Sequence, residues 1–400
     1  MRTDFEFFST KNVVFGNGSI QKLPQILDRY QAENVLIVTD QGIKGAGILK
    51  KITHLLEGSG LNISVYDKTL PEPPLSTAVE CYNFAKDQQA TDVIIGLGGG
   101  SSIDLSKVMA LLIKYGGNPQ DYVGENLVPG PIAPLIAIPT TAGTGSEVTS
   151  VAVLNDTDNK IKAGVSDNNL RPAVALLDPE LTVNLPPYVT ACSGIDALAH
   201  AIEAFTAKDF RYIEAEGELL FQGSNPISDS LALEAIRLIT NNLTLVVQQG
   251  SNLEARGNML IGSLLAGMAF SNAGTAAAHA LAYPIGGLCE SPHGELTGLL
   301  LPHVMEYNVG VVPEKLEKIS EAFHVDNKDL DTKEAANFAI EEVFNLVEQI
   351  GLPTKLSHIG VKEEDLSIIA EKALPIERLI RNNPRVPTKD TILELLKKAY

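Results

Sequence analysis

The chain has 400 residues, of which 44% are hydrophobic and 20% are charged, so it contains enough apolar material for two hydrophobic cores. Its formal net charge of −18 disfavours binding to nucleic acid or to an anionic membrane surface, and no apolar run reaches the length of about eighteen residues that a membrane span needs. Three scattered cysteines, and a start without a signal-peptide pattern, lead us to expect a cytoplasmic protein.

The first half of the chain alternates short β-branched runs with helical patterns. The expected strands are 34–40, 62–67, 91–100, 134–141 and 174–182. The expected helices are 43–60, one that begins near residue 76, and 102–114. Strands that alternate with helices predict a parallel sheet with helices on both faces, so we expect residues 1–185 to form an α/β domain.

The segment GLGGGSSIDLSK (96–107) joins an expected buried strand to an expected helix. Glycines allow the backbone to approach an anion closely, and a helix N-terminus presents unpaired N–H groups. The three glycines and the following serines therefore suit a phosphate group. The spacing matches neither the dinucleotide fingerprint nor a Walker loop, and consecutive glycines also suit a tight turn that binds nothing.

A second loop of small and hydroxyl-bearing residues, PTTAGTGSEVTS (139–150), follows another expected buried strand. Taken alone, it could be a polar loop that caps itself with Ser/Thr turns. Two such loops at the carboxyl ends of strands in one sheet meet where open α/β sheets bind ligands. Asp40 ends the first expected strand, where a carboxylate can accept hydrogen bonds from a ribose and disfavour a 2′-phosphate; a solvated loop acid is the alternative.

Helical periodicity dominates the second half, so residues 186–400 are expected to form an all-helical domain. The expected helices are 189–207, 228–249, 253–271, 273–286, 313–323, 332–350, 363–373 and 388–399. The segment 208–225 is expected to be an insertion or loop between helices. Near the N-terminus, residues 7–18 have a hairpin-like pattern that could pair across a dimer.

Asp196 and His200 lie four residues apart in SGIDALAHAIEAF and therefore share one face of an expected helix. Buried alone they would be unfavourable, so they need partners, although ordinary hydrogen-bonded core polar groups are also possible. His279 and His293 stand in the apolar, glycine-rich segment HALAYPIGGLCESPHGE. One carboxylate and three imidazoles would give a divalent metal four ligands. The remaining histidines are interpreted as surface or packing residues: His54, His303, His324 and His358.

The joint order of these motifs resembles the iron-containing (group III) alcohol dehydrogenases along essentially the whole chain. The motifs that carry the resemblance are GGGSSIDLSK, PTTAGTGSEVT, LLDPELT, SGIDALAHAIEAF, SNPISDSLALEAI, HALAYPIGG with PHG, and LLPHVMEYN. It implies a Rossmann-like NAD(P)-binding domain followed by an all-helical metal-binding domain, an architecture similar to that of dehydroquinate synthases, with the catalytic cleft between them. It also implies Fe²⁺, or sometimes Zn²⁺, and a homodimer or higher homo-oligomer.

The resemblance assigns roles to individual positions. It implies that the metal ligands are Asp196, His200, His279 and His293. It implies cofactor contacts from Gly98, Gly99, Gly100, Ser101, Thr140, Thr141 and Thr144. Asp104 and Lys162 match positions near the nicotinamide, and Asp40 matches the position that favours NAD over NADP.

One position departs from many members of the family. Four residues after the third metal ligand, they carry a second histidine that is thought to relay a proton, whereas this chain has Tyr283. A phenol is a weaker base near neutral pH than an imidazole. Tyr283 could therefore be a proton relay or a wall of the substrate pocket, and Phe270 is a second candidate for the wall.

The expected reaction is hydride transfer between a primary alcohol, or its aldehyde, and NAD(P), with a small molecule as the only partner. Three alternatives remain open at this point. LLFQGSNPISD (219–229) resembles the branch with hydroxyacid–oxoacid transhydrogenases, which act on 4-hydroxybutyrate-type and 2-oxo acids. A metal-dependent lyase on the same scaffold is the second, and a nucleotide-binding module with a structural metal is the third.

Overall fold

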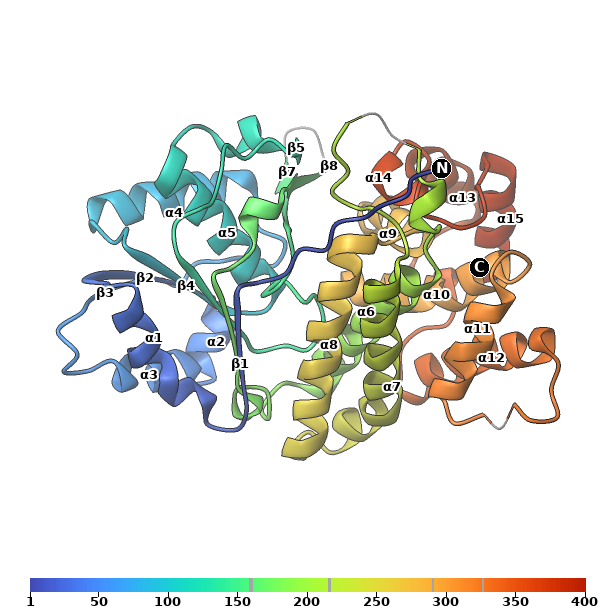
Figure 1. Ribbon diagram of the computed structural model, residues 1–400, viewed down its shortest axis with the longest axis horizontal. Helices are drawn as coiled ribbons and strands as arrows, with labels where there is room; N and C mark the ends of the chain where they lie inside the picture. Colours follow the sequence, from blue (N-terminus) through green and yellow to red (C-terminus); the bar gives the residue numbers. More distant parts are fainter. Residues whose placement is uncertain (158–160, 215–216, 290, 326) are drawn as a thin grey trace. The chain divides into compact units, whose positions relative to one another are not determined.

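The computed structural model describes residues 1–157, 161–214, 217–289, 291–325 and 327–400, and the chain divides into two compact units (Figure 1). The α/β unit comprises Phe8–Thr141 and Gly145–Leu185. The helical unit comprises Pro186–Tyr400 together with Met1–Phe7 and Ala142–Thr144. An α/β first part and a helical second part confirm the predicted fold class. That residues 1–185 and 186–400 are two independent domains stays a prediction.

The α/β unit is built on a parallel sheet of six strands among the described residues, in the order β1-β9-β6-β4-β2-β3. The strands of this sheet are β1 (Asn12–Phe15), β2 (Asn34–Val38), β3 (Asn62–Tyr66), β4 (Val93–Gly98), β6 (Leu135–Pro139) and β9 (Val174–Leu177). The helices of the unit are α1 (Leu23–Arg29), α2 (Gln41–Gly45), α3 (Ile48–Leu55), α4 (Leu75–Asp87) and α5 (Gly100–Tyr115).

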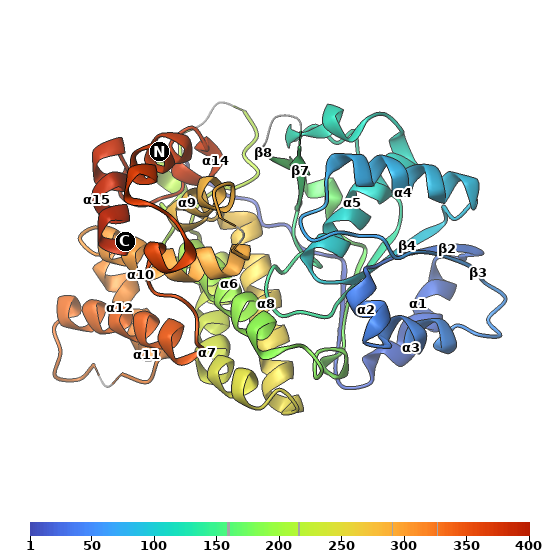
Figure 2. The ribbon, with the colours of Figure 1, turned by 180° about the vertical axis from the view of Figure 1, so that it is seen from behind.

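Alternating side chains of the strands enter two different cores, as expected for a sheet covered on both faces. Val35 and Ile37 of β2 pack with α1 and α3, whereas Leu36 and Val38 pack with α4 and α5. The ribbon shows the same two helical layers from both sides (Figures 1 and 2). The two glycine- and hydroxyl-rich loops both follow central strands, β4 and β6, which are neighbours in the sheet.

Three details of the α/β unit differ from expectation. The helix expected at 43–60 is broken into α2 and α3, because Gly47 adopts a left-handed backbone with φ 77°. Residues 7–18 do not form a hairpin, since β1 pairs in parallel with β9 at the edge of the main sheet. An unpredicted small sheet contains β5 (Gly124–Glu125), β7 (Val151–Asp156) and β8 (Ile161–Ser166), with β7 and β8 antiparallel.

The helical unit is organised around one buried helix, α6, against which α7, α8 and α10 pack. Its helices begin with α6 (Pro187–Thr206), α7 (Pro226–Gln248), α8 (Leu253–Ala273), α9 (Ala277–Gly286), α10 (His293–Asn308), α11 (Pro313–Ala322) and α12 (Thr332–Gln349). Toward the C-terminus follow α13 (Leu366–Ala373), α14 (Glu377–Ile380) and α15 (Lys389–Ala399). The sequence patterns did not predict α10. The break between α8 and α9 falls at Gly274, whose φ is 94°.

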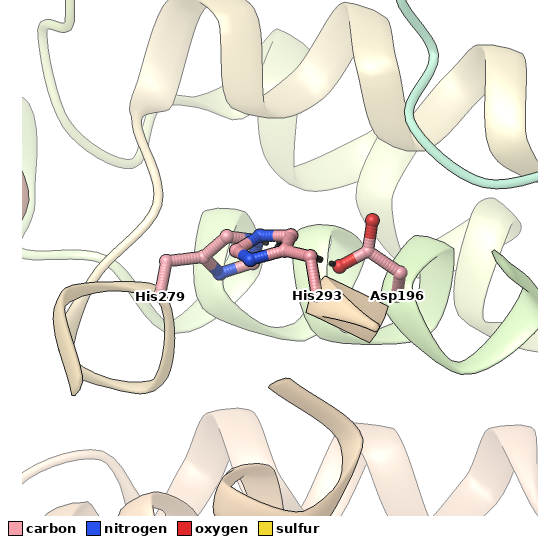
Figure 3. A group of neighbouring side chains, drawn as sticks. All are labelled: Asp196, His279 and His293. Carbon is pink, nitrogen blue, oxygen red and sulfur yellow. Dashed lines mark ion pairs between the residues drawn. The ribbon is translucent and has the colours of Figure 1, made fainter. Parts of the chain in front are cut away.

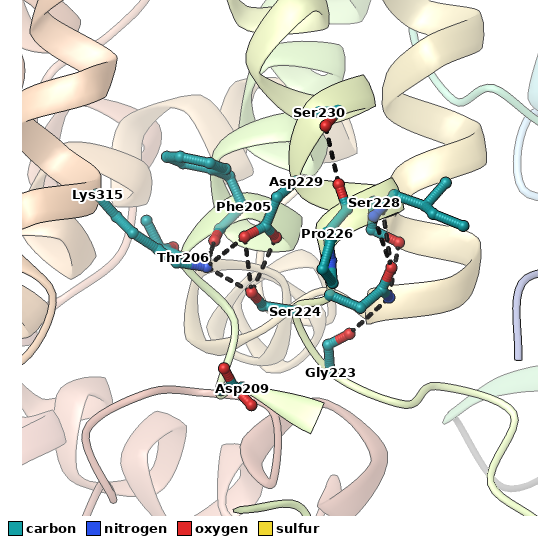
Figure 4. A network of polar contacts seen from close by, with 12 residues as sticks. Phe205, Thr206, Asp209, Gly223, Ser224, Pro226, Ser228, Asp229, Ser230 and Lys315 are labelled. Carbon is teal, nitrogen blue, oxygen red and sulfur yellow. Dashed lines mark hydrogen bonds and ion pairs between the residues drawn. The ribbon is translucent and has the colours of Figure 1, made fainter. Parts of the chain in front are cut away.

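Lys315 of α11 holds the C-terminal end of α6 in place (Figure 4). Its ammonium group donates to the carbonyl oxygen of Phe205 at 2.5 Å, to Ser224 Oγ at 2.5 Å and to Asp229 Oδ2 at 3.0 Å. A cation at this end of a helix satisfies a carbonyl group that has no partner within the helix. The same network fixes the end of the expected loop at 208–225, of which residues 215–216 lie outside the described part.

By length and hydropathy alone, α7 could cross a membrane, and the pair α8 and α9, bent by 99°, would pass the same test only as one broken span. Core helices of globular proteins pass this test as well. Helix α7 contributes Ala235, Ile236 and Ile239 to the core that it shares with α6 and α8. Packing against neighbouring helices thus accounts for its apolar character.

Candidate metal centre and cofactor loops

Helix α6 carries two of the predicted metal ligands on one face. It starts at Pro187, where the missing N–H and the fixed φ suit a first turn, and small residues then allow neighbouring helices to approach closely. Asp196 and His200 are 4% and 6% exposed, so both polar side chains are held in the core of the unit. Buried groups of this kind require partners.

Two further predicted ligands meet Asp196 from other helices (Figure 3). His279 lies in the first turn of α9 and His293 is the first residue of α10. One ligand atom from each of Asp196, His279 and His293 lies within 4.8 Å of the other two. The Nε2 atoms of His279 and His293 are 3.8 Å and 4.0 Å from Asp196 Oδ1. Residues that are 83 and 97 positions from Asp196 in the sequence thus lie close to it.

These distances fit a metal ion better than direct hydrogen bonds. They exceed the hydrogen-bonding range, but two ligand atoms that each bind one ion at about 2.0–2.2 Å can lie up to about 4 Å apart. Nε2 of His279 is buried and has no hydrogen-bond partner among the described residues. A buried lone pair beside a buried carboxylate is the donor set that a divalent first-row metal prefers. The residues therefore fit the expected ion.

His200 lies next to these three residues without joining the closest group. Its Nδ1 atom is 3.8 Å from Asp196 Oδ2 and has no hydrogen-bond partner within the described part of the chain. Its ring lies 4.4 Å from the ring of His279 and stacks on Phe270 at 4.2 Å, measured between centroids. The Nδ1 atom of His200 thus faces the same carboxylate, and Phe270 packs against the His200 ring.

Glu203, which the sequence analysis did not single out, contacts His279 on the side of the ring opposite the centre. It stands three residues after His200 on α6 and is 2% exposed. Its carboxylate accepts hydrogen bonds from Nδ1 of His279 at 2.6 Å and from the backbone N–H groups of Ala276 at 2.8 Å and Ala278 at 2.6 Å. Glu203 thereby caps the start of α9 and leaves Nε2 of His279 directed at the centre.

The charges in the centre favour a bound cation. Burial alone would raise the pKa of Asp196, but the three imidazoles and a hydrogen bond from Thr297 reverse this, so the net shift is downward. Burial lowers the pKa of His200 to about 3, which keeps that imidazole neutral and able to coordinate. Burial also acts to lower the pKa of His279, but Glu203 outweighs it and the net shift is upward. Without a metal, the Nε2 atom of His279 therefore binds a proton more readily than that of an ordinary histidine.

The exposed edge of the centre is formed by His293, Tyr283 and Arg378. The His293 side chain is 31% exposed, whereas that of His279 is 4% exposed. The ring of Tyr283 stacks on His293 with centroids 5.6 Å apart. Arg378 of α14 donates a hydrogen bond to the Tyr283 hydroxyl at 3.1 Å, and its charge acts to lower the pKa of His279. Tyr283 thus reaches the site, with its hydroxyl bonded to a cation.

The first cofactor loop brings Asp40 next to the glycines. Gly98 has φ 145°, and a Cβ atom there would lie 2.8 Å from Ser102 Oγ and 3.2 Å from Asp40 Oδ2. Helix α5 starts at Gly100 without a side-chain cap, which leaves its first N–H groups available to an anion. Asp40 also caps α2 through the N–H of Ile43 at 3.0 Å and accepts from Ser102 at 3.2 Å. These residues fit a dinucleotide phosphate and ribose.

The remaining predicted cofactor residues have different local roles. Gly99 approaches Thr141, and the hydroxyl of buried Thr140 has no partner in the segments that the structure describes, which leaves it available to a ligand. Ser101 accepts a hydrogen bond from the backbone N–H of Glu72. The carboxylate of Glu72 forms an ion pair with Lys162 at 2.5 Å. Thr144 belongs to the helical unit, together with Ala142 and Gly143.

Asp104, which is predicted to lie near the nicotinamide, is bonded to the second loop. It accepts hydrogen bonds from the hydroxyl of Ser146 and from the N–H of Val153, the latter at 3.0 Å. Its Oδ1 atom also lies 3.7 Å from the ammonium group of Lys107, which is fully buried. Burial lowers the pKa of Lys107 to about 8. Asp104 thus links α5 to the loop that follows β6.

Comparisons with known proteins agree with this geometry. Models of the iron-containing alcohol dehydrogenase family match residues 10–179, and those of its C-terminal domain match residues 190–400. The NAD-dependent methanol dehydrogenase of Bacillus methanolicus is 34% identical over 98% of this chain and 99% of its own. The crystal structure of a 1,3-propanediol oxidoreductase has a TM-score of 0.93 at 35% identity, covering 99% of this chain and 100% of its own. A sulfoacetaldehyde reductase from Bifidobacterium kashiwanohense, solved with NAD⁺, has a TM-score of 0.87 at 28% identity and covers 100% of this chain and 99% of its own.

Proposed function

The chain belongs to the iron-containing alcohol dehydrogenase family, and we propose that it transfers hydride reversibly between a short primary alcohol and NAD, with a divalent metal held by Asp196, His200, His279 and His293. Its class is that of a metal-dependent, NAD-linked oxidoreductase. The observation that carries the assignment of the site is the convergence of Asp196, His279 and His293, with an unpartnered Nε2 atom on His279. The names of the relatives, which are dehydrogenases and reductases, support hydride transfer over a lyase or a structural metal site.

Each group near the centre has a distinct task in this reaction. When bound, the metal serves as a Lewis acid that favours the ionised alcohol, and NAD accepts the hydride. Asp196 supplies the negative charge that retains a cation, and Glu203 fixes the orientation of His279. Tyr283 forms a wall at the exposed edge, with its hydroxyl bonded to Arg378. Gly98–Gly100 and Thr140 hold the phosphates, and Asp40 favours NAD over NADP.

The test combines metal analysis with an activity assay. Protein loaded with Fe²⁺ or Zn²⁺ is mixed with NAD and a panel of short primary alcohols, and formation of the reduced cofactor is followed by absorbance. We expect turnover that chelation abolishes and metal addition restores. His279→Ala should bind less metal and lose turnover, while binding of NAD by the α/β unit is retained. Absence of turnover with any alcohol or aldehyde in metal-loaded protein would contradict the proposal.

We further propose a cytoplasmic homo-oligomer. Strand β1 is an edge of the main sheet, and its Val13 and Phe15 side chains are 38% and 42% exposed. An apolar edge strand of this kind is a site where a second copy can pair. The mass of the wild-type assembly in solution should be a multiple of the mass of one chain. Val13→Glu should lower the mass of the assembly toward that of one chain. A wild-type protein that is monomeric at micromolar concentration would contradict this part of the proposal.

A further inference from the structure

The metal centre is open on one side only, as judged from the exposure of its ligands. The side chains of Asp196, His200 and His279 are 5%, 8% and 4% exposed, whereas that of His293 is 31% exposed. A substrate oxygen must approach the centre from the accessible side, which is the side of His293. The part of the substrate remote from the reacting carbon then passes whatever residues border His293.

The residues that border His293 are an aromatic ring and a guanidinium group. Tyr283 stacks on the imidazole with an interplanar angle of 19°. Arg378 lies next along this edge, with its guanidinium carbon 5.8 Å from the centroid of the tyrosine ring and Nη2 3.1 Å from the tyrosine hydroxyl. Both side chains are half-buried. The distance between the ring centroids of His293 and Tyr283 is therefore less than 6 Å. The distance from the Tyr283 centroid to the guanidinium carbon of Arg378 is less than 6 Å as well.

Arg378 is charged but not neutralised. Among the described residues, no carboxylate forms an ion pair with it, although the chain has 49 acidic residues and only 31 lysines and arginines. Other partly buried cations do have such partners: Lys162 pairs with Glu72, and Lys315 pairs with Asp229. The tyrosine hydroxyl accepts from one of the five N–H donors of the guanidinium, which leaves other N–H groups in the same plane available to an anion.

We propose that Arg378 binds an anionic group of the substrate, so that the preferred substrate is a short alcohol or aldehyde that carries a carboxylate or sulfonate at its far end. This inference depends on the proposed function, because it describes the substrate of the same centre. The net charge of −18 repels a free anion, and a half-buried guanidinium supplies the local attraction that binding such a substrate requires. Tyr283 positions the guanidinium and separates it from the reacting end.

The experiment compares substrates of equal length with and without the anion. Values of kcat/KM are measured for 1-propanol, 1-butanol and 1-pentanol and for the ω-hydroxycarboxylates of three, four and five carbons, with 2-hydroxyethanesulfonate against ethanol to separate sulfonate from carboxylate. We expect the wild type to prefer the anionic member of at least one pair. Arg378→Gln should lower kcat/KM for that anion by about 10- to 100-fold, mainly through KM, and change the neutral alcohol by less than about threefold. Arg378→Lys should recover part of the loss.

A matched control is available on the same segment. Arg385 also lies over a tyrosine, with its guanidinium carbon 4.2 Å from the centroid of Tyr307, and donates to the carbonyl oxygen of that residue at 2.9 Å. Arg385→Gln removes the same charge and the same kind of ring contact away from the centre. It should leave the preference between anionic and neutral substrates unchanged.

The possible results separate this inference from the proposed function. Equal losses for neutral and anionic substrates in Arg378→Gln, or a wild type that prefers the neutral member of every pair, would overturn the role of Arg378. Absence of turnover with all substrates would instead refute the proposed function. In that case calorimetric binding of the unreactive carboxylates butyrate and pentanoate still decides the inference: binding weakened at least tenfold in Arg378→Gln supports it, and equal binding refutes it.

Discussion

At the scale of single residues, Glu203 determines how His279 faces the centre. A ligating imidazole usually donates its second N–H to a carboxylate or carbonyl group, and this partner fixes which nitrogen is free to bind the metal. Here one carboxylate accepts from Nδ1 of His279 and from two N–H groups at the start of α9. The geometry of one ligand and the position of one helix therefore depend on the same side chain.

The prediction for Glu203→Gln follows from this geometry. The amide oxygen can accept either from Ala276 and His279 together or from Ala278 alone, and in both orientations the amide nitrogen opposes an N–H group. The Nδ1–H of His279 also loses its charged acceptor, so the imidazole is less firmly oriented and its Nε2 atom is a weaker metal ligand. We expect metal affinity to fall by about 10- to 100-fold. Titration with Zn²⁺ against a competing chelator measures this directly and needs no turnover.

Glu147→Gln provides the control for that measurement. Glu147 is another buried carboxylate, 2% exposed, but it belongs to the α/β unit, whereas the proposed metal ligands belong to the helical unit. It should bind Zn²⁺ as the wild type does. If Glu203→Gln also retained wild-type affinity, Glu203 would be a cap for α9 and nothing more.

Glu147 itself predicts a pH dependence of stability. Burial raises the pKa of this carboxyl group from 4.5 to about 7. In the unfolded chain the group loses its proton near its ordinary value, whereas the folded chain retains it up to about 7. Between these values the folded state binds more protons, so stability falls as pH rises. Glu147→Gln removes this term and should be more stable than the wild type by about 3 kcal/mol at pH 8, with little difference at pH 5.

Urea unfolding of the chelated proteins at the two pH values measures this difference without interference from metal release. Glu57→Gln is the control, because the Glu57 side chain is 70% exposed. It should show no pH-dependent change relative to the wild type. An equal effect of Glu147→Gln at pH 5 and pH 8 would indicate a packing effect instead of a titration.

At the scale of elements, the site depends on how closely α10 crosses α6. Gly294 follows the ligand His293, and a Cβ atom there would lie 2.0 Å from the carbonyl oxygen of Cys192 and 3.0 Å from Asp196 Cβ. At Gly298, one turn later, a Cβ atom would lie 2.7 Å from Cγ1 of Ile195. Two glycines on one face of α10 thus allow the helix to lie directly against the one that carries Asp196.

We therefore expect Gly294→Ala to displace α10. The nearest atom is a backbone oxygen, which cannot move aside as the end of a side chain can, so the clash should lower the free energy of unfolding by about 1–3 kcal/mol. It should also move His293 away from Asp196 and weaken metal binding by at least about tenfold. Gly310→Ala, where no atom lies within 4 Å of the added Cβ, should alter neither quantity. Unchanged zinc affinity in Gly294→Ala would contradict this account.

The elements also show what the sequence could and could not predict. Apolar β-branched runs bounded by polar residues located β2, β4 and β6, and the spacing of four located Asp196 and His200 on one helix face. Helix α10 escaped prediction because Gly294, Gly298 and Pro302 lower its intrinsic helix propensity, which packing against α6 overrides. The role of Glu203 was not predicted because its partner, His279, is 76 residues away in the sequence. The spacing of seven residues from Asp196, which places both on a similar face of α6, was the available signal.

At the scale of the whole molecule, most residues predicted to bind NAD belong to a different compact unit from those predicted to bind the metal. The four predicted metal ligands all belong to the helical unit, whereas Asp40, Gly98–Gly100, Thr140 and Thr141 belong to the α/β unit. Thr144 is the exception, because it belongs to the helical unit. The order of strands and the assignment of Met1–Phe7 to the helical unit were beyond sequence patterns, because both depend on contacts between distant segments. Arg2, for example, contacts Arg211 and Gln222.

This division predicts that metal and NAD stabilise separate parts of the chain. A ligand at a hundred times its Kd adds about 2.7 kcal/mol to the stability of whichever unit must be folded to bind it. We expect Zn²⁺ to slow hydrogen exchange in α6, α9 and α10, and NAD to slow it in β2, β4 and α5. In His279→Ala the protection by zinc should disappear while that by NAD persists. Equal protection of both units by zinc alone would show instead that the chain opens as one cooperative body, and the boundary near residue 185 would then not separate independent domains.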